Sequence, residues 1–439
     1  MIKSIGFYLH ADGLGEVDCS NVLDGNPGIG GSEYAIISLV YYLVKYKGNF
    51  NITVYSSEKM ILPVGLRVVK VTNLKDAILA AEIDGCEILI FKHHPMWLVP
   101  QNIFTLSDRK IKFIVWCHNF VSNGHLNFYC DNDQFIKLVC VGQEQMDLYR
   151  DHRAFLKSIC IYNGVTLPPM GDCNSLIPFE LRENVVTYVG SLIPEKGFFY
   201  LAKAWPNIFS SLPDAKLNII GSGQLYDRNA KMGKWGIAEE AYENAFMQFL
   251  TMNGKIHPSV RFLGVLGKEK NDILKVTKVG VPNPSGLTET FGYTAIEMQL
   301  MGAKVATMKC PGYLDTVTNG ILYSATNELE NSVVELCKQP INEYSKVYSV
   351  LKERFSYEII MEKWANLLME GKQYQNNSLT CLANPNYKMK RQKEFLRRLK
   401  SKYPILYILP SIDSVWELFL VVARKLQRVR ISLFCLQKN

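Results

Sequence analysis

The stretch Pro282–Gly302 reads PNPSGLTETFGYTAIEMQLMG and follows a short apolar run, Val279–Val281. From about Gly292 onward its apolar residues recur with the period of an α-helix, which predicts an inward face formed by Tyr293, Ile296, Leu300 and Met301. Glu297 falls on this face, where a carboxylate is costly unless another group neutralises it or hydrogen-bonds to it. The sequence therefore predicts a strand, a loop and a helix with an acidic residue on its inner side.

A second carboxylate, Glu289, lies eight residues before Glu297, in the loop that leads into the helix. Between the two, Phe291-Gly292 lets backbone amides approach a ligand, and a helix N-terminus favours phosphate. Glu297 is expected about 7 Å along the axis from that anion site. This spacing suits a sugar nucleotide, with the sugar at Glu289, the diphosphate at the amides and the ribose at Glu297. A buried Glu paired with some Arg or Lys, plus an incidental loop Glu, explains the same residues, so both interpretations stay open.

Length and composition describe an ordinary globular protein. At 439 residues the chain is expected to form two domains, because single cores stop growing at about 250–300 residues. Its eleven cysteines are scattered without a CxxC pair, which favours a reducing compartment and argues against a zinc site. The N-terminal MIKSIGFYLHADGLG predicts a strand and a glycine loop, not a signal peptide, and no uncharged apolar stretch is long enough to predict a transmembrane helix.

The net charge of +8 is unevenly distributed along the chain. Residues 371–439 hold 14 Lys and Arg against 3 Asp and Glu, a net charge of +11. Residues 1–370 hold 35 against 38, a net charge of −3. A near-neutral body with a strongly basic tail indicates a surface partner for the tail and carries no information about chemistry in the body.

The first half of the chain alternates apolar strands with amphipathic helices. A helix is predicted at residues 32–45, after the glycine-rich GIGGSE, and strands at residues 2–9, 52–55, 87–91, 111–117 and 137–141. This alternation predicts a parallel, doubly wound sheet that binds ligands at the carboxyl ends of its strands. The residues expected there are Gly30, Gly31, His93, His94 and His118. No GxGxxG follows the first strand, which argues against a dinucleotide-binding oxidoreductase.

A polar segment with several prolines, residues 164–183, is predicted to link this unit to a second α/β unit that begins at Val185. The second unit has a predicted helix at 198–211, a charged and mostly helical stretch at 225–253, and strands at 185–190, 216–220, 260–263, 279–281, 303–308 and 320–322. The predicted organisation is a domain at 1–168, a domain at 185–355, a closing helix at 356–371 and a basic tail at 372–439.

Several motifs, taken in their order along the chain, resemble those of the retaining glycosyltransferases of family 4. They are GGSE at 30–33, His118 at a strand end, YNGV at 162–165, VGSLIPEKG at 189–197, a strand with GSG at 217–223, VRFLG at 260–264, and PS, Glu289, FG and Glu297 in the opening stretch. The resemblance covers roughly residues 1–370 and not the tail. It implies an α/β protein with the GT-B fold, in which two Rossmann-like, doubly wound domains face a cleft.

The resemblance also implies roles for individual residues. Glu297 is expected to hold the ribose, and Glu289 the hydroxyl groups of the donor sugar and the charge that develops beside it. Lys196 is expected to offset charge on the leaving diphosphate, and His118 to contact the donor sugar from across the cleft. Glu289, Lys196 and His118 are thus the predicted catalytic residues. Further contacts with the nucleotide sugar are expected from Gly30, Gly31, Thr290, Phe291, Gly292, Tyr293 and Thr294.

The function implied is transfer of a sugar, with retention, from a nucleotide-diphosphate donor. UDP-sugars are the expected donors, and the expected acceptor is a saccharide or lipid-linked saccharide in bacterial surface polysaccharide biosynthesis, with no metal required. One departure is Ser191, where family members commonly carry an Arg, so the diphosphate loses one of two cations. This departure leaves an alternative open: a catalytically degenerate GT-B protein that binds a nucleotide sugar or a partner and organises other transferases at a membrane.

The tail carries a prediction of its own. Lys388–Lys402 is densely basic, and residues 414–433 form a candidate helix with an apolar stripe and Trp416. A basic amphipathic helix with a Trp suits the headgroup region of an anionic bilayer, whereas nucleic-acid binding needs no apolar stripe. We therefore expect residues 388–436 to bind an anionic membrane surface and the protein to be cytoplasmic, peripheral on the inner face of the plasma membrane. Packing of the stripe on the body is the alternative.

Overall fold

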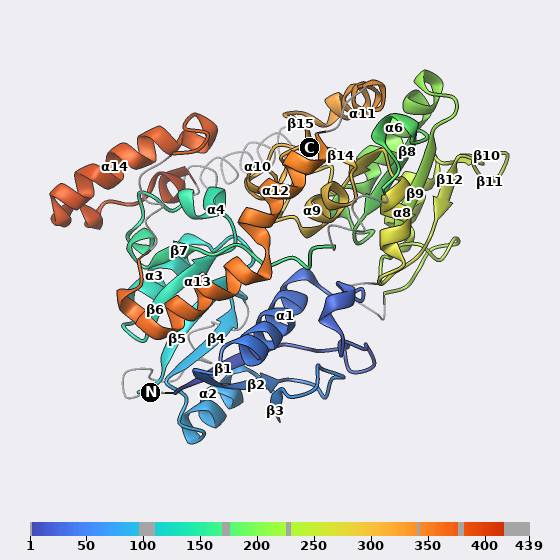
Figure 1. The fold of residues 1–439 in the computed structure, drawn as a ribbon. Helices are drawn as coiled ribbons and strands as arrows, with labels where there is room; N and C mark the ends of the chain where they lie inside the picture. The colour runs from blue at the N-terminus through green and yellow to red at the C-terminus, as the bar shows by residue number, and fades with distance from the viewer. Residues whose placement is uncertain are drawn as a thin grey trace, which may run out of the picture.

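The computed structural model describes residues 2–95, 110–168, 176–224, 230–339, 343–375 and 382–416. These residues form two parallel β-sheets, which Figure 1 shows in separate parts of the molecule with helices around each of them. A short antiparallel hairpin, β10 (Thr251–Met252) and β11 (Lys255–Ile256), stands apart from both sheets.

The first sheet has seven parallel strands in the order β3-β2-β1-β4-β5-β6-β7. They are β1 (Lys3–Leu9), β2 (Phe50–Ser56), β3 (Arg67–Lys70), β4 (Ile88–Lys92), β5 (Lys112–Cys117), β6 (Phe135–Cys140) and β7 (Ser158–Cys160). Its helices are α1 (Gly31–Tyr46), α2 (Leu74–Ile83), α3 (Asn123–Asp131) and α4 (Gln143–Asp147). The five predicted strands are present; β3, a largely exposed edge strand, and the three-residue β7 were not predicted.

The second sheet has six parallel strands in the order β12-β9-β8-β13-β14-β15. They are β8 (Val185–Val189), β9 (Lys216–Ile220), β12 (Val260–Phe262), β13 (Val279–Val281), β14 (Lys304–Met308) and β15 (Gly320–Tyr323). Its helices are α6 (Phe198–Ser211), α7 (Glu240–Met247), α8 (Lys270–Val276), α9 (Tyr293–Leu300), α10 (Pro311–Thr316) and α11 (Leu329–Lys338). Counted within each sheet, both contain the doubly wound order 3-2-1-4-5-6, to which the first sheet adds β7 at its edge, and this order confirms the predicted pair of Rossmann-like units.

The predicted helix over 225–253 is wrong for most of its described residues, of which α7 is the helical part. The preceding loop is held by the carboxylate of Glu243, which is buried and accepts hydrogen bonds from the backbone of Trp235, Ile237 and Ala238. A carboxylate that satisfies three backbone donors stabilises an irregular loop, and the charged composition of the stretch gives no sign of this.

After α12 (Tyr344–Phe355) the chain returns to the first sheet through α13 (Tyr357–Glu370), which lies against α1 (Figure 1). Trp364 of α13 is fully buried, with its ring centroid 4.6 Å from that of Trp116 on β5. This closing helix therefore shares a core with the N-terminal sheet. We propose the predicted boundaries, 1–168, 185–355, 356–371 and 372–439, as the domain division.

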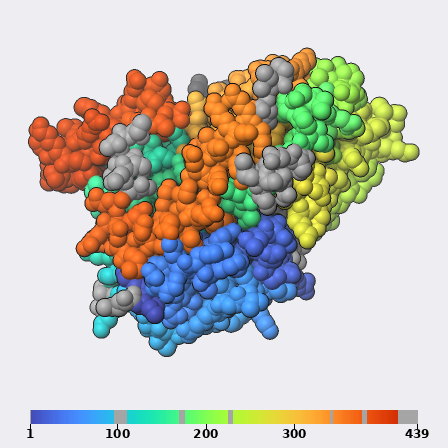
Figure 2. Space-filling view, in the orientation of Figure 1, coloured from blue at the N-terminus to red at the C-terminus, as the bar shows by residue number. Residues whose placement is uncertain are grey.

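The described part of the tail packs on the N-terminal unit. It contains α14 (Lys390–Lys402) and the 3-10 turn η10 (Pro404–Ile408), which lie at the edge of the molecule beside α4 (Figures 1 and 2). The side of α14 that faces the body is charged, because its lysines find acidic partners and backbone carbonyls there. The candidate helix at 414–433 lies outside the described residues from 417 onward.

Candidate active site

A cavity of about 740 Å³ lies between the carboxyl ends of the two sheets. One wall comes from the loops after β8 and β13, the neighbouring strands at which the order of the second sheet reverses. The other wall comes from residues after β1, β4 and β5 of the first sheet. Crevices at such switch points bind ligands in open α/β sheets, because loops on adjacent strands diverge there.

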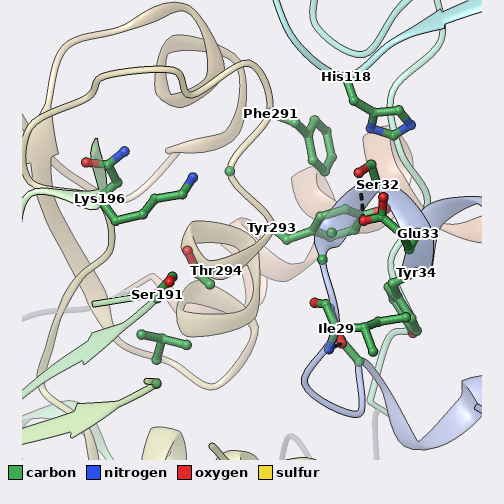
Figure 3. A pocket seen from close by; sticks show the side chains of 18 of the residues that line it. Ile29, Ser32, Glu33, Tyr34, His118, Ser191, Lys196, Phe291, Tyr293 and Thr294 are labelled. Atoms are coloured by element: carbon green, nitrogen blue, oxygen red, sulfur yellow. Dashed lines mark hydrogen bonds between the residues drawn. The ribbon is translucent and has the colours of Figure 1, made fainter. Parts of the chain in front are cut away.

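All eleven predicted site residues line this cavity, although their roles stay predictions. Figure 3 shows Lys196 and Ser191 on one side, His118 and Glu33 on the other, and Phe291 between them. The predicted residues at the cavity are Gly30, Gly31, His118, Lys196, Glu289, Thr290, Phe291, Gly292, Tyr293, Thr294 and Glu297.

Helix α9 begins as the sequence predicts, directly after Gly292. Gly292 adopts a left-handed conformation with φ of 85°, and a Cβ atom added to it would lie 2.6 Å from the ring of Tyr313. Only glycine meets both conditions. No side chain caps this end of the helix among the described residues, which leaves the first backbone N–H groups available to an anion.

Each carboxylate of the opening stretch is ion-paired with a lysine from another element. Lys196 Nζ lies 3.1 Å from Glu289 Oε2, and Lys270 Nζ lies 2.8 Å from both oxygens of Glu297. Lys196 ends the 3-10 turn after β8, and Lys270 opens α8. Glu297 therefore has the cation partner that a carboxylate on an inner helix face requires, and it also lines the cavity. A structural ion pair and a place in a ligand-binding site are thus compatible for this residue.

Sequence reasoning missed Lys270, which has an exposed fraction of only 7%. It stands in a lysine-rich segment, GKEKNDILK, in which nothing in the sequence separates it from its solvated neighbours. The only indication of such a residue was the inward position of Glu297, which requires a cation or a hydrogen-bond donor nearby. The helical periodicity does not identify the residue that supplies it.

The opposite wall carries a third ion pair, between Lys92 at the end of β4 and Glu33 in the first turn of α1. Burial opposes ionisation of Glu33, but the charge of Lys92 and hydrogen bonds from Lys92 and Ser32 outweigh it and hold the pKa of Glu33 below its usual range. The three lysines among the described lining residues are thus each paired with a glutamate.

His118 follows β5 and is almost fully buried. Desolvation, followed by the charge of Lys92, lowers the pKa of His118 to about 3, so its imidazole is neutral near pH 7. Its Nε2 atom has no hydrogen-bond partner among the described residues. Its backbone carbonyl accepts a hydrogen bond from the Thr290 hydroxyl, which ties the loop after β13 to the opposite wall.

Three further positions that the sequence predicts near this site are His93, His94 and Ser191. His93 is fully buried, lies 2.7 Å from the hydroxyl of Tyr129 and does not line the cavity, whereas His94 does. Ser191 lines the cavity, and its hydroxyl donates to the carbonyl of Ser222 at 3.2 Å. Ser191 therefore brings no charge to this wall.

Two kinds of feature are absent from the ranges that the structure describes: a cluster of metal ligands and a membrane-spanning helix. No group of three or more His, Cys, Asp or Glu side chains in these ranges could hold a metal ion. Within the same ranges, no helix combines the length and the apolar character needed to cross a bilayer.

Comparison with known proteins adds to this geometry. Residues 183–339 match the family described as glycosyl transferases group 1. An uncharacterized glycosyltransferase of Haemophilus influenzae is 26% identical over 278 residues, which cover 60% of this chain and 71% of that protein.

Solved structures are similar in fold at low sequence identity. A glycosyltransferase from Rickettsia africae superposes with a TM-score of 0.58 at 14% identity, over 84% of this chain and 98% of that one. The apo form of the lipopolysaccharide outer core galactosyltransferase WaaB gives a TM-score of 0.54 at 14% identity, over 84% and 99%. Both likenesses agree with the predicted arrangement of two Rossmann-like units facing a cleft.

Proposed function

The chain belongs to the group 1 glycosyltransferases, and from this membership we propose that it moves a sugar, with retention, from a nucleoside-diphosphate donor to a saccharide acceptor. The observation that carries the proposal is the pairing of Glu289 with Lys196 at the mouth of the β13 loop, 3.1 Å apart, beside the uncapped start of α9. The carboxylate of Glu289, the ammonium group of Lys196 and the first backbone amides of α9 therefore all line the same cavity.

In the proposed mechanism the diphosphate lies at the first turn of α9, near Lys196. As the bond between the sugar and the diphosphate breaks, negative charge grows on the leaving group, and Lys196 and the amides stabilise it more than they stabilise the intact donor. Glu289 accepts hydrogen bonds from the sugar hydroxyls and stabilises the positive charge that develops on the sugar ring. His118 is neutral and offers its unpartnered Nε2 atom to the same sugar.

We propose a UDP-sugar as the donor, with its ribose at Glu297 and its base toward the apolar part of the same wall. That part contains Ile220, Val265 and Leu266, which also line the cavity. Transfer is expected to need no divalent metal, so that a chelator leaves the initial rate unchanged.

The test is a screen of nucleotide sugars for thermal stabilisation, followed by measurement of slow donor hydrolysis. Specific binding stabilises a protein by about 2.7 kcal/mol at a hundredfold excess over the dissociation constant. Hydrolysis by the wild type that is lost in Glu289→Ala, and kept in the exposed control Glu240→Ala on α7, supports the proposal. Equal hydrolysis by both variants would contradict it.

A second candidate function is a catalytically degenerate protein that binds a nucleotide sugar or a partner and organises other transferases at a membrane. The observation in its favour is the uncharged Ser191 at the cavity wall. Stabilisation by a nucleotide sugar without any turnover, including with Ser191→Arg, would favour this candidate. Restored or raised turnover in Ser191→Arg favours the enzyme with a weakly held diphosphate.

We further propose that the acceptor is a lipid-linked saccharide of a bacterial surface polysaccharide and that the protein works in the cytoplasm, at the inner face of the plasma membrane. The support for this location is the charge of +11 in residues 371–439. Anionic lipids attract such segments electrostatically.

A further inference from the structure

The two faces of α14 differ in what surrounds them. Its inner residues recur at helical spacing and are almost fully buried: Lys390, Lys393, Glu394 and Lys400. Lys390 pairs with Glu144 of α4, and Glu394 accepts a hydrogen bond of 2.7 Å from Arg150. The inner lysines are satisfied by the body of the protein, and Glu394 also accepts hydrogen bonds from Arg397 and Arg398 of α14 itself, so these inner charges are not available to a partner.

The outer side of α14 presents Arg391, Phe395, Arg398 and Lys402, at positions i, i+4, i+7 and i+11 of the helix. All four are exposed; 65% of Phe395 is accessible, as is 74% of the Arg398 side chain. A phenylalanine between cations on an exposed helix face has no role in the core, because the core side of this helix is the charged one.

Two more exposed apolar residues, Ile405 and Ile408, lie in η10, which packs against α14, and both line a groove between the tail and the body. Ile405 and Ile408 are 70% and 79% exposed. Figure 2 shows this part of the tail projecting at the edge of the molecule. Large aliphatic side chains that are scattered singly over a surface need no explanation, but a group of them beside cations marks an interaction site.

We propose that this outer tail face, formed by Arg391, Phe395, Arg398, Lys402, Ile405 and Ile408, docks on the surface of an anionic lipid bilayer. Arginine and lysine match lipid phosphates, while phenylalanine and isoleucine enter the boundary between headgroups and acyl chains. The net charge of +11 over residues 371–439 favours an anionic lipid surface as the partner. Within the described part of the basic segment 388–436, only this face would contact the membrane; Lys390, Lys393 and Lys400 would not, because they are buried against the body.

The chain beyond the described residues has the composition that this partner requires. In residues 417–439 the basic residues are Arg424, Lys425, Arg428, Arg430 and Lys438, against the acidic Glu417, and they alternate with leucine, valine and phenylalanine. The inference refines the membrane location proposed above and does not depend on the transfer reaction.

The first experiment tests the apolar part of the face by sedimentation of the full chain with vesicles. Vesicles of phosphatidylcholine and phosphatidylglycerol in equal amounts are compared with vesicles of phosphatidylcholine alone. The wild type is expected to sediment with the anionic vesicles and to be released by salt. Ile405→Asp/Ile408→Asp is expected to stay in the supernatant, whereas the matched control Ile83→Asp, at an 86% exposed position of α2, sediments like the wild type.

The second experiment tests the cations. Arg391→Glu/Lys402→Glu is expected to weaken binding to the anionic vesicles at least thirtyfold, since losing two such charges alone accounts for about that factor at low salt. The ammonium group of Lys402 lies over the ring of the exposed Tyr403, and neither Arg391 nor Lys402 is buried, so this variant is expected to fold even where the aspartate pair does not. Its control is Lys338→Glu/Lys352→Glu, which reverses two exposed charges on α11 and α12.

Three results would overturn the inference: no binding by the wild type, equal binding to both kinds of vesicle, or wild-type binding by both outer-face variants. A different result would point to a protein contact. In that case the wild type self-associates in buffer but does not bind vesicles, and Ile405→Asp/Ile408→Asp abolishes the self-association. Donor hydrolysis is expected to be the same in all these variants, so a failure of the proposed function is seen separately.

Discussion

Lys270 holds its ammonium nitrogen 2.8 Å from each carboxylate oxygen of Glu297, and the two side chains come from different helices of the same cavity wall. Lys270 opens α8, and Glu297 lies midway along α9. Only 7% of Lys270 is exposed, and a buried ammonium group is costly without a carboxylate partner, which Glu297 supplies. The pair fixes the direction of the Glu297 carboxylate before any nucleotide arrives.

The first prediction follows from that pair. Glu297→Gln keeps an acceptor for Lys270 but removes the charge, so the free energy of unfolding is expected to fall by about 1–3 kcal/mol and nucleoside diphosphate affinity to fall with it. Lys270→Met/Glu297→Gln removes both charges and is expected to recover the stability but not the affinity. Urea denaturation and calorimetric titration with UDP measure the two effects. An unchanged affinity in Glu297→Gln would remove Glu297 from the binding site.

The second prediction concerns Lys196. If its ammonium group stabilises the leaving diphosphate, Lys196→Ala lowers kcat by more than it weakens binding of the intact donor. A loss of about 2 kcal/mol of transition-state stabilisation lowers the rate by roughly thirtyfold. Steady-state kinetics on the donor found in the screen measures it, with the exposed Lys203→Ala on α6 as the control. A rise in KM alone means that Lys196 only binds the ground state.

The fold could be predicted from the sequence because both sheets are buried on both faces. Strands such as Val185–Val189 are then continuous apolar runs, and their alternation with helices fixes a parallel sheet. The same reasoning found Glu289 and Glu297, since local sequence alone determines the loop and the helix that carry them. Edge strand β3 was not predicted because it is only four residues long and largely exposed, with just Val68 and Val69 between two charged residues.

The partners of those residues could not be predicted. Lys270 and Glu297 are 27 positions apart in the chain, and a lysine in a charged segment carries no sign of which distant carboxylate it will meet. The tail shows the same limit: Lys390 and Arg391 are neighbours of equal charge, yet one is fully buried and the other exposed. Which face of this charged helix packs inward depends on residues far earlier in the chain: Glu144 lies 246 positions before its partner Lys390, and Arg150 lies 244 positions before Glu394.

The third prediction concerns Asp315 of α10, which is buried and accepts a hydrogen bond of 2.9 Å from the backbone N–H of Glu144. Burial raises the pKa of Asp315 to about 7, although that hydrogen bond opposes the shift. The carboxyl group of Asp315 therefore holds its proton more tightly in the folded protein than in the unfolded chain. As a consequence, the free energy of unfolding falls as pH rises from the ordinary pKa range of aspartate through about 7.

Asp315→Asn removes this titration. The variant is expected to lose less stability than the wild type between about pH 5 and about pH 8, by an amount on the order of 1–3 kcal/mol. Urea denaturation at the two pH values measures the difference. The prediction fails if both proteins change in parallel, which would show that Asp315 is ionised throughout and held by Arg354, whose guanidinium lies 3.9 Å away.

The fourth prediction concerns the attachment of the tail. Lys390 is fully buried against Glu144 and lies 3.4 Å from Asp147, so its removal leaves two buried carboxylates with one cation fewer. Lys390→Met is expected to cost about 3–5 kcal/mol of stability, as breaking a buried ion pair does. The matched control is Arg391→Met, one residue along the helix on its exposed side, which is expected to change stability by less than about 0.5 kcal/mol.

A second substitution separates an ion pair from simple packing. Glu144→Gln in the Lys390→Met background removes one of the uncompensated charges and is expected to restore part of the lost stability, whereas Glu144→Gln alone destabilises. The coupling energy from chemical denaturation of the four proteins measures this. If the effects of the two substitutions simply add, Lys390 contributes only its aliphatic stem, and the tail is held by its other contacts, such as Lys393 with the carbonyl of Leu148 at 2.9 Å.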